Sequence, residues 1–167
     1  MLLLSTFASK RTLTQQALGI FSFFSLSLLV LLSLGWISHY SYGLGKISQL
    51  PSIMSFEARA EIWGYYFSLL PLSLWMLWRQ YPLNSLKLEI TLYISHLGLL
   101  LFWAHIISQT DQYFLAFINM VFLFSMLIIM ELLFWKKNML ISGLLLPNLL
   151  WLGYLIVMDL EAYALFT

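Results

Sequence analysis

The chain has 167 residues, of which 62% are hydrophobic, 17% are aromatic and only 9% are charged. So few charges cannot cover the surface of a soluble domain of this size, for which roughly 25% is typical. The net charge of +1 and the absence of cysteine exclude a nucleic-acid-binding protein, a disulfide scaffold and a thiolate metal site. The composition predicts an integral membrane protein.

Five apolar segments each supply about the 20 helical residues that cross a bilayer core of about 30 Å. In chain order they are Ala17–Ser38, Ile62–Trp78, Leu88–Ile107, Tyr113–Trp135 and Leu140–Met158. They are apolar all round, as lipid-facing helices are, and they lack the polar–apolar alternation of a membrane barrel. The sequence therefore predicts an all-α integral membrane protein, with one five-transmembrane-helix bundle formed by residues 1–167.

Proline and loop-forming residues mark the breaks and bends of this bundle. The segment 40–55 is rich in Ser and Gly and contains Pro51, which predicts the longest loop. Pro71 falls inside the second span and Pro147 inside the fifth. Each lacks a backbone donor, so each is expected to kink its helix.

Basic residues near the span ends predict the orientation. Those on the side of the N-terminus are Lys10, Arg11, Arg79, Lys87, Lys136 and Lys137, against Lys46 and Arg59 on the other side. Basic loops stay inside, so we expect the N-terminus on the cytoplasmic or matrix side and the C-terminus outside. The expected location is a bacterial or mitochondrial inner membrane.

The spacing of aromatic residues in three spans resembles that of a known family. The second span opens with Trp63-Gly-Tyr-Tyr-Phe67, and the third contains Tyr93 and Trp103. The fifth reads Leu144-Leu-Leu-Pro-Asn-Leu-Leu-Trp151. Over residues 63–159 the chain resembles the translocator protein family, also called tryptophan-rich sensory proteins, and the resemblance implies a five-helix membrane protein.

The chain also departs from the family pattern. The stretch 51–60, Pro-Ser-Ile-Met-Ser-Phe-Glu-Ala-Arg-Ala, lacks the Trp-x-Pro-Pro motif that caps the ligand cavity in the family. Leu100 and Leu101 stand where Asn-Trp is usual, and Asp159 stands where the family has Asn. The sequence is therefore that of a divergent member.

The resemblance implies a cavity that binds a porphyrin, a sterol or a similar lipophilic molecule. The candidate ligand-binding residues are Trp63, Trp103, Asn119, Trp151 and Asp159. Aromatic walls suit a flat apolar ligand, although the same residues can equally serve core packing. We predict no metal ligand and no catalytic residue.

The polar residues of the spans have a structural and a functional interpretation. Our hypothesis places His105, Asn119 and Asp159 in one polar cluster near the outer mouth, where it joins helices or holds a polar group of a ligand. We expect His96 to be hydrogen-bonded rather than to bind haem. Glu131 is expected to pair with a lysine that follows it, at 136 or 137.

Two functions are compatible with these features, and neither is enzymatic, because no catalytic motif occurs. The first is a translocator-like membrane protein that binds a tetrapyrrole or sterol in an aromatic-lined cavity. The second is an accessory structural subunit of a large membrane complex, such as one of the respiratory chain. Expected partners are the lipid bilayer and a second copy or other membrane subunits, but no nucleic acid. An open cavity favours the first, and a bundle filled by Leu100 and Leu101 favours the second.

Overall fold

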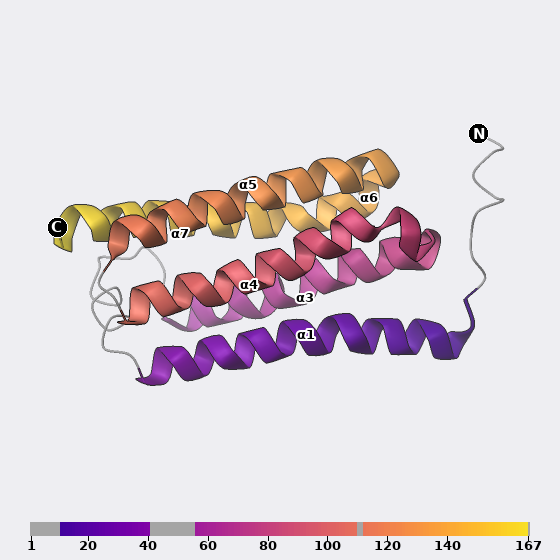
Figure 1. Cartoon of the computed structure of the whole chain (residues 1–167), viewed down its shortest axis with the longest axis horizontal. Helices are drawn as coiled ribbons and strands as arrows, with labels where there is room; N and C mark the ends of the chain where they lie inside the picture. Colours follow the sequence, from indigo (N-terminus) through magenta and orange to yellow (C-terminus); the bar gives the residue numbers. More distant parts are fainter. Residues whose placement is uncertain (1–10, 41–55, 110–111, 167) are drawn as a thin grey trace.

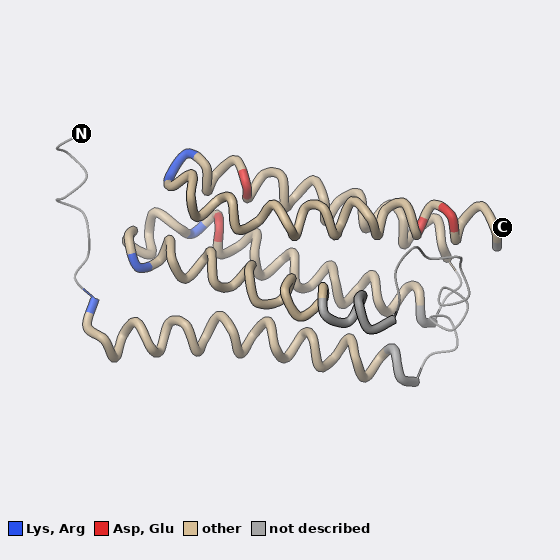
Figure 2. Tube along the Cα trace, turned by 180° about the vertical axis from the view of Figure 1, so that it is seen from behind, with Lys and Arg blue, Asp and Glu red and all other residues tan. Residues whose placement is uncertain are grey.

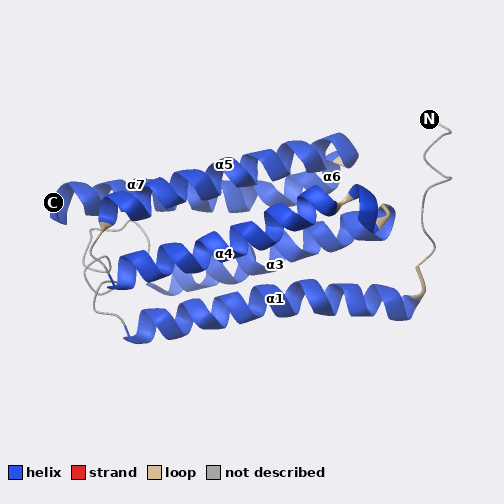
Figure 3. Ribbon diagram, in the orientation of Figure 1, coloured by secondary structure: helices blue, strands red, loops and turns tan. Residues whose placement is uncertain are grey.

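The structure is a computed structural model that describes residues 11–40, 56–109 and 112–166. Long helices dominate the described part: α1 (Leu13–Tyr40), α3 (Phe56–Gln80), α4 (Lys87–Gln109), α5 (Tyr113–Lys137) and α7 (Leu146–Phe166). Shorter turns are η1 (Leu83–Ser85), α6 (Met139–Ser142) and η2 (Gly143–Leu145). Every regular element in these ranges is a helix (Figure 3). The predicted all-α class is therefore confirmed for them.

Four stretches of the described helices are long and apolar enough to cross a membrane. They are Leu13–Ile37, Lys87–Ile107, Tyr113–Lys137 and Met139–Leu165. The helix α3 is not among them, because its tryptophans, tyrosines and terminal charges lower its mean hydropathy. The structure thus supports a membrane protein, and apolar length alone accounts for four of the five predicted spans.

Long helices that follow one another along the chain alternate in direction along the bundle axis (Figure 1). The helix α1 packs against α3 and α4, α4 against α5, α5 against α7, and α7 against α3. These contacts close a ring, so that inward-facing residues of all five helices share one interior.

The interior of the ring is filled by aliphatic side chains together with buried aromatic ones such as Tyr66, Tyr93 and Phe134. Fully buried members come from four helices: Leu70, Leu74, Leu77, Leu100, Met120, Leu123, Leu127 and Leu152. Leu101 is partly buried and packs against this core. Close packing therefore holds the bundle together through its middle. Leu100, which stands where the family usually has Asn, takes part in this packing.

The expected single helix over residues 140–158 is broken in the structure. The chain forms α6, then the 3-10 turn η2, and only then α7. Pro147 is the second residue of α7 rather than an interior residue, and proline fits a first helical turn because no backbone donor is needed there. Pro71 lies inside α3, as predicted. The predicted loop at 40–55 lies outside the described residues, except for Tyr40 at the end of α1.

Arg11, Arg79, Lys87, Lys136 and Lys137 lie at the end of the bundle where α1 begins and α3 and α5 end (Figure 2), whereas Arg59 lies near the start of α3. Arg11 precedes α1, Arg79 lies in the last turn of α3, and Lys137 ends α5. The acidic residues Asp159 and Glu161 lie near the end of α7, at the opposite end. Glu89 and Glu131 lie at the basic end as well, so the bundle is polarised by an excess of basic over acidic residues at that end.

The start of α1 is fastened to the end of α3. Arg11 donates hydrogen bonds to the carbonyl oxygens of Trp78 and Tyr81, and its guanidinium lies 3.6 Å from the centre of the Trp78 ring. The Trp75 indole N–H donates to the Gln16 carbonyl over 3.0 Å. Gly19 faces Trp78 so closely that a Cβ there would lie 2.3 Å from the ring. The absence of a side chain at Gly19 therefore allows this tryptophan to pack.

Candidate functional site

The three predicted tryptophans meet inside the bundle, although they come from three helices. The ring centre of Trp63 on α3 lies 6.3 Å from that of Trp103 on α4. It lies 5.6 Å from that of Trp151 on α7, with the two rings nearly perpendicular. Trp63 also stacks on Phe67, with the ring centres 5.7 Å apart. We call Trp63, Trp103 and Trp151 the tryptophan cluster.

The two predicted polar residues each join a pair of helices. The Trp103 indole N–H donates to Oδ2 of Asp159 over 2.8 Å, which ties α4 to α7. The Asn119 amide donates to the carbonyl oxygen of Leu99 over 3.0 Å, which ties α5 to α4. Asp159 is only 4% exposed, whereas the His105 side chain is exposed. The helix-joining role thus has direct contacts for Asn119 and Asp159.

His96 is fully buried and hydrogen-bonded, as the sequence predicts. Its Nε2 atom pairs with the hydroxyl of Tyr66, and the two rings stack with their centres 6.0 Å apart. The Asn148 amide donates to the Tyr66 carbonyl over 3.2 Å. Within the described ranges no group of His, Asp and Glu side chains could hold a metal ion. His96 therefore connects α4 to α3 through the Tyr66 hydroxyl.

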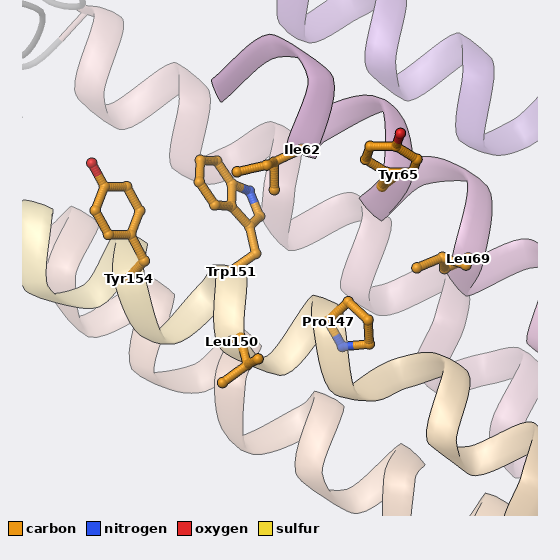
Figure 4. A pocket seen from close by; sticks show the side chains of 7 residues that line it. All are labelled: Ile62, Tyr65, Leu69, Pro147, Leu150, Trp151 and Tyr154. Carbon is orange, nitrogen blue, oxygen red and sulfur yellow. The ribbon is translucent and has the colours of Figure 1, made fainter. Parts of the chain in front are cut away.

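An apolar groove of about 390 Å³ runs between α3 and α7, beside the tryptophan cluster. Its lining residues are Ile62, Tyr65, Leu69, Pro147, Leu150, Trp151 and Tyr154. Figure 4 shows α3 and α7 each contributing one wall. Trp151 belongs both to this wall and to the cluster behind it. A ligand in this groove could therefore contact Trp151, which is one of the predicted site residues.

Sequence reasoning missed most of the groove. The positions 62, 65 and 69 fall three and four residues apart, as do 147, 150, 151 and 154, so each set shares one helix face. That periodicity identifies the two faces. It does not reveal that they face each other, because the pairing of α3 with α7 depends on the whole bundle.

Two polar atoms on the groove wall are buried without a hydrogen-bond partner in the described part of the chain. They are Nε1 of Trp151 and the hydroxyl oxygen of Tyr154. The two rings stack, with centres 5.3 Å apart and planes inclined by 22°. Buried polar atoms are usually hydrogen-bonded, so these exceptions call for an explanation.

The predicted pairing of Glu131 with a neighbouring lysine is wrong for Lys137. Lys137 binds Glu89 of α4 over 2.5 Å and donates to the Ser85 carbonyl over 2.5 Å. Glu131 instead accepts from the Ser142 hydroxyl over 2.5 Å. The reason is tertiary: the start of α4 lies beside the end of α5, and it offers a carboxylate from outside the helix.

Together, the helical bundle and its apolar spans define an integral membrane protein whose interior is rich in aromatic side chains. The model of the TspO/MBR family matches residues 23–164. The chain therefore belongs to the TspO/MBR family, in agreement with the resemblance of its motifs. None of the curated proteins compared with the chain matches it.

Proposed function

We propose that the protein binds a lipophilic ligand of the tetrapyrrole or sterol class against the α3–α7 groove. The observation that carries the proposal is the double position of Trp151, which lines the groove and packs on Trp63 of the tryptophan cluster. A ligand on the groove wall would thus contact an aromatic surface that three helices hold in place.

Apolar burial and ring stacking would supply most of the affinity. The groove volume of about 390 Å³ lies within the range of roughly 300–1,000 Å³ for small-molecule sites. Tyr65 on α3 and Trp151 on α7 offer aromatic surface from opposite walls. Trp63 and Trp103 would support Trp151 from the interior, and Asp159 would fix Trp103.

Filling the groove tests this proposal. In Leu69→Trp a large ring would occupy the groove, whereas in Leu132→Trp it would point away from the interior at an exposed position of α5. Titration of the purified protein with a porphyrin and with a sterol should show binding that Leu69→Trp weakens by about tenfold, or about 1.4 kcal/mol. Leu132→Trp should bind like the unmodified protein. Equal binding by both variants would contradict the groove as the site.

One specific observation favours the alternative function, an accessory subunit of a large membrane complex. Leu100 is fully buried and Leu101 packs on the core, so the centre of the bundle is filled. The native size of the protein after extraction in a mild detergent distinguishes the two functions. A free-standing receptor is expected at 19.5 kDa for a monomer, or twice that for a homodimer, beyond the detergent. Co-migration with a much larger assembly would support the subunit.

The orientation belongs to the same proposal: the basic end of the bundle faces the cytoplasm or the mitochondrial matrix, and α7 ends outside. The support is that Arg11, Arg79, Lys87, Lys136 and Lys137 lie at one end of the bundle (Figure 2), against Arg59 at the other. Since the chain has no cysteine, single cysteines at Lys87 and Glu161 give a clean test. A membrane-impermeant thiol reagent should label Glu161→Cys in sealed cells or mitoplasts and Lys87→Cys only after lysis. The reverse pattern would refute the orientation.

A further inference from the structure

Two arginines at the junction of α1 and α3 rest on tryptophan rings instead of pairing with carboxylates. The Arg11 guanidinium lies 3.6 Å from the centre of the Trp78 ring, and that of Arg79 lies 4.9 Å from the Trp75 ring. The hydrogen bonds of Arg11 go to backbone carbonyl oxygens of α3 and the turn after it, which carry no net charge. In the ranges that the structure describes, neither arginine forms an ion pair with Asp or Glu. Two positive charges are therefore not neutralised by the protein.

The two guanidinium groups belong to one surface of the bundle. Trp75 and Trp78 are three residues apart on α3, so they are neighbours on one face, with Cβ atoms about 5–6 Å apart. Both contact α1, because the Trp75 indole donates to the Gln16 carbonyl and the Trp78 ring packs against Gly19. The helix α1 also begins here, and the positive end of its dipole adds to the same potential. The junction is therefore a compact basic site between two helices.

The site lies at the level where the head groups of lipids lie. Arg79 is in the last turn of α3 and is exposed, at the basic end of the bundle (Figure 2). Tryptophan rings near the ends of membrane helices typically lie at this level as well. At the same end, Lys137 has a carboxylate partner of its own in Glu89. The α1–α3 junction thus differs from the α4–α5 junction in offering arginines to an outside anion.

The chemistry of the junction fits a phosphate that is attached to acyl chains. Guanidinium groups bind phosphate oxygens through paired hydrogen bonds, and basic pockets between membrane helices bind anionic head groups. Only 17% of the most apolar window of α1 is buried, and Leu13 and Leu18 in its first two turns are exposed. This surface can cover acyl chains, whereas a soluble phosphate would gain nothing from it.

We propose that the α1–α3 junction binds one anionic phospholipid, whose phosphate contacts Arg79 and Arg11 and whose acyl chains lie along α1. Arg11 uses two of its nitrogen atoms for the carbonyls of α3 and the following turn, which leaves further N–H groups for the phosphate. The site is separate from the α3–α7 groove, and its ligand is a component of the membrane itself. A bound lipid would fasten α1, the least buried of the four apolar spans, to the rest of the bundle.

Native mass spectrometry of the full-length protein in a neutral detergent tests the site. The probes are phosphatidylglycerol, phosphatidylcholine with the same acyl chains, and glycerol phosphate. One phosphatidylglycerol molecule should bind more tightly than phosphatidylcholine and should raise the temperature of thermal unfolding. Equal binding of the two lipids by the unmodified protein would overturn the proposal. Binding of glycerol phosphate as strong as that of phosphatidylglycerol would overturn a phospholipid as the occupant.

Arg79→Gln removes one of the two charges without touching a hydrogen bond between the helices. We expect it to weaken the binding of phosphatidylglycerol by about fivefold, the value of about 1 kcal/mol for one basic residue at the head groups. Binding of phosphatidylcholine should not change. Lys136→Gln is the matched control, because it removes the same charge from an exposed position of α5 at the same end, and it should bind like the unmodified protein.

The comparison of the variants has two outcomes that contradict the site. A full preference for phosphatidylglycerol in Arg79→Gln would place the lipid elsewhere. Equal losses in Arg79→Gln and Lys136→Gln would show a general effect of charge instead of a site at the α1–α3 junction. The comparison of the two lipids on the unmodified protein does not depend on the folding of any variant.

Discussion

Replacement of Asp159 separates a helix-joining role from a ligand-binding one. Asp159 is 4% exposed and accepts the Trp103 indole N–H over 2.8 Å. Asp159→Leu keeps a side chain of similar size but removes the acceptor, so the Trp103 donor is left buried and unpaired. A buried donor left without an acceptor lowers the free energy of unfolding by about 1–3 kcal/mol. We expect the lower half of that range, because hydrogen bonds between membrane helices contribute about 0.6–1.7 kcal/mol.

Two further variants isolate the hydrogen bond from the change in packing. Asp159→Asn keeps an amide oxygen that can accept from Trp103, so it should retain most of the stability. Trp103→Phe removes the donor, so adding Asp159→Leu to it should cost less than in the unmodified protein. We expect a coupling energy of about 1 kcal/mol between the two positions.

Unfolding in detergent, followed by circular dichroism for the single variants and the double variant, gives these numbers. A coupling energy near zero would refute the reasoning, because the hydrogen bond would then contribute nothing to joining α4 and α7. An Asp159→Leu protein that is as stable as the unmodified chain but no longer binds porphyrin or sterol would instead assign Asp159 to the ligand.

Two other contacts give predictions of stability. Gly19→Ala should destabilise the protein by about 1–3 kcal/mol through overpacking, because the new Cβ would lie 2.3 Å from the Trp78 ring; Gly98→Ala, which meets no atom within 4 Å, should be neutral or stabilising in the same thermal unfolding measurement. Lys137→Met should lower the free energy of unfolding by about 3 kcal/mol. That is the low end of the range for a broken buried ion pair, because the Lys137 side chain is 21% exposed and that of Glu89 is 3% exposed. Adding Glu89→Leu should restore most of that loss, and a double variant as unstable as Lys137→Met would contradict the ion pair.

The long helices and the meeting of the three tryptophans were predicted from the sequence on different grounds. Apolar length identifies four of the five long helices, because a bilayer-sized run of apolar residues has few alternatives. The meeting of Trp63, Trp103 and Trp151 followed from their register in the family pattern. Periodicity within one helix carries no such information, because it does not say which helix faces which.

The parts that the sequence did not predict depend on tertiary contacts or on local breaks in an apolar run. The turn at Gly143–Leu145 interrupts a stretch that reads as continuous, and Gly143 and Pro147 were its only local signals. Lys137 has a carboxylate six residues before it in Glu131, yet it pairs with Glu89 across the α4–α5 contact. A choice between a local and a distant partner is made by the packing of helices, which spacing along the chain does not encode.

The filled interior and the groove together restrict how a ligand would reach the tryptophan cluster. Leu100 and Trp103 pack against neighbours from the other helices, so a ligand at the centre would have to displace them and leave a strained or opened core. The groove is already hollow, and Leu150 on its wall is 77% exposed. In a membrane that exposed wall meets lipid, which is where a lipophilic molecule is dissolved. Under our proposal, a ligand that enters laterally from the bilayer would meet the groove wall with less rearrangement than one that enters the centre. The α3–α7 face, rather than the centre, would then be the place where ligand binding and a purely structural role differ.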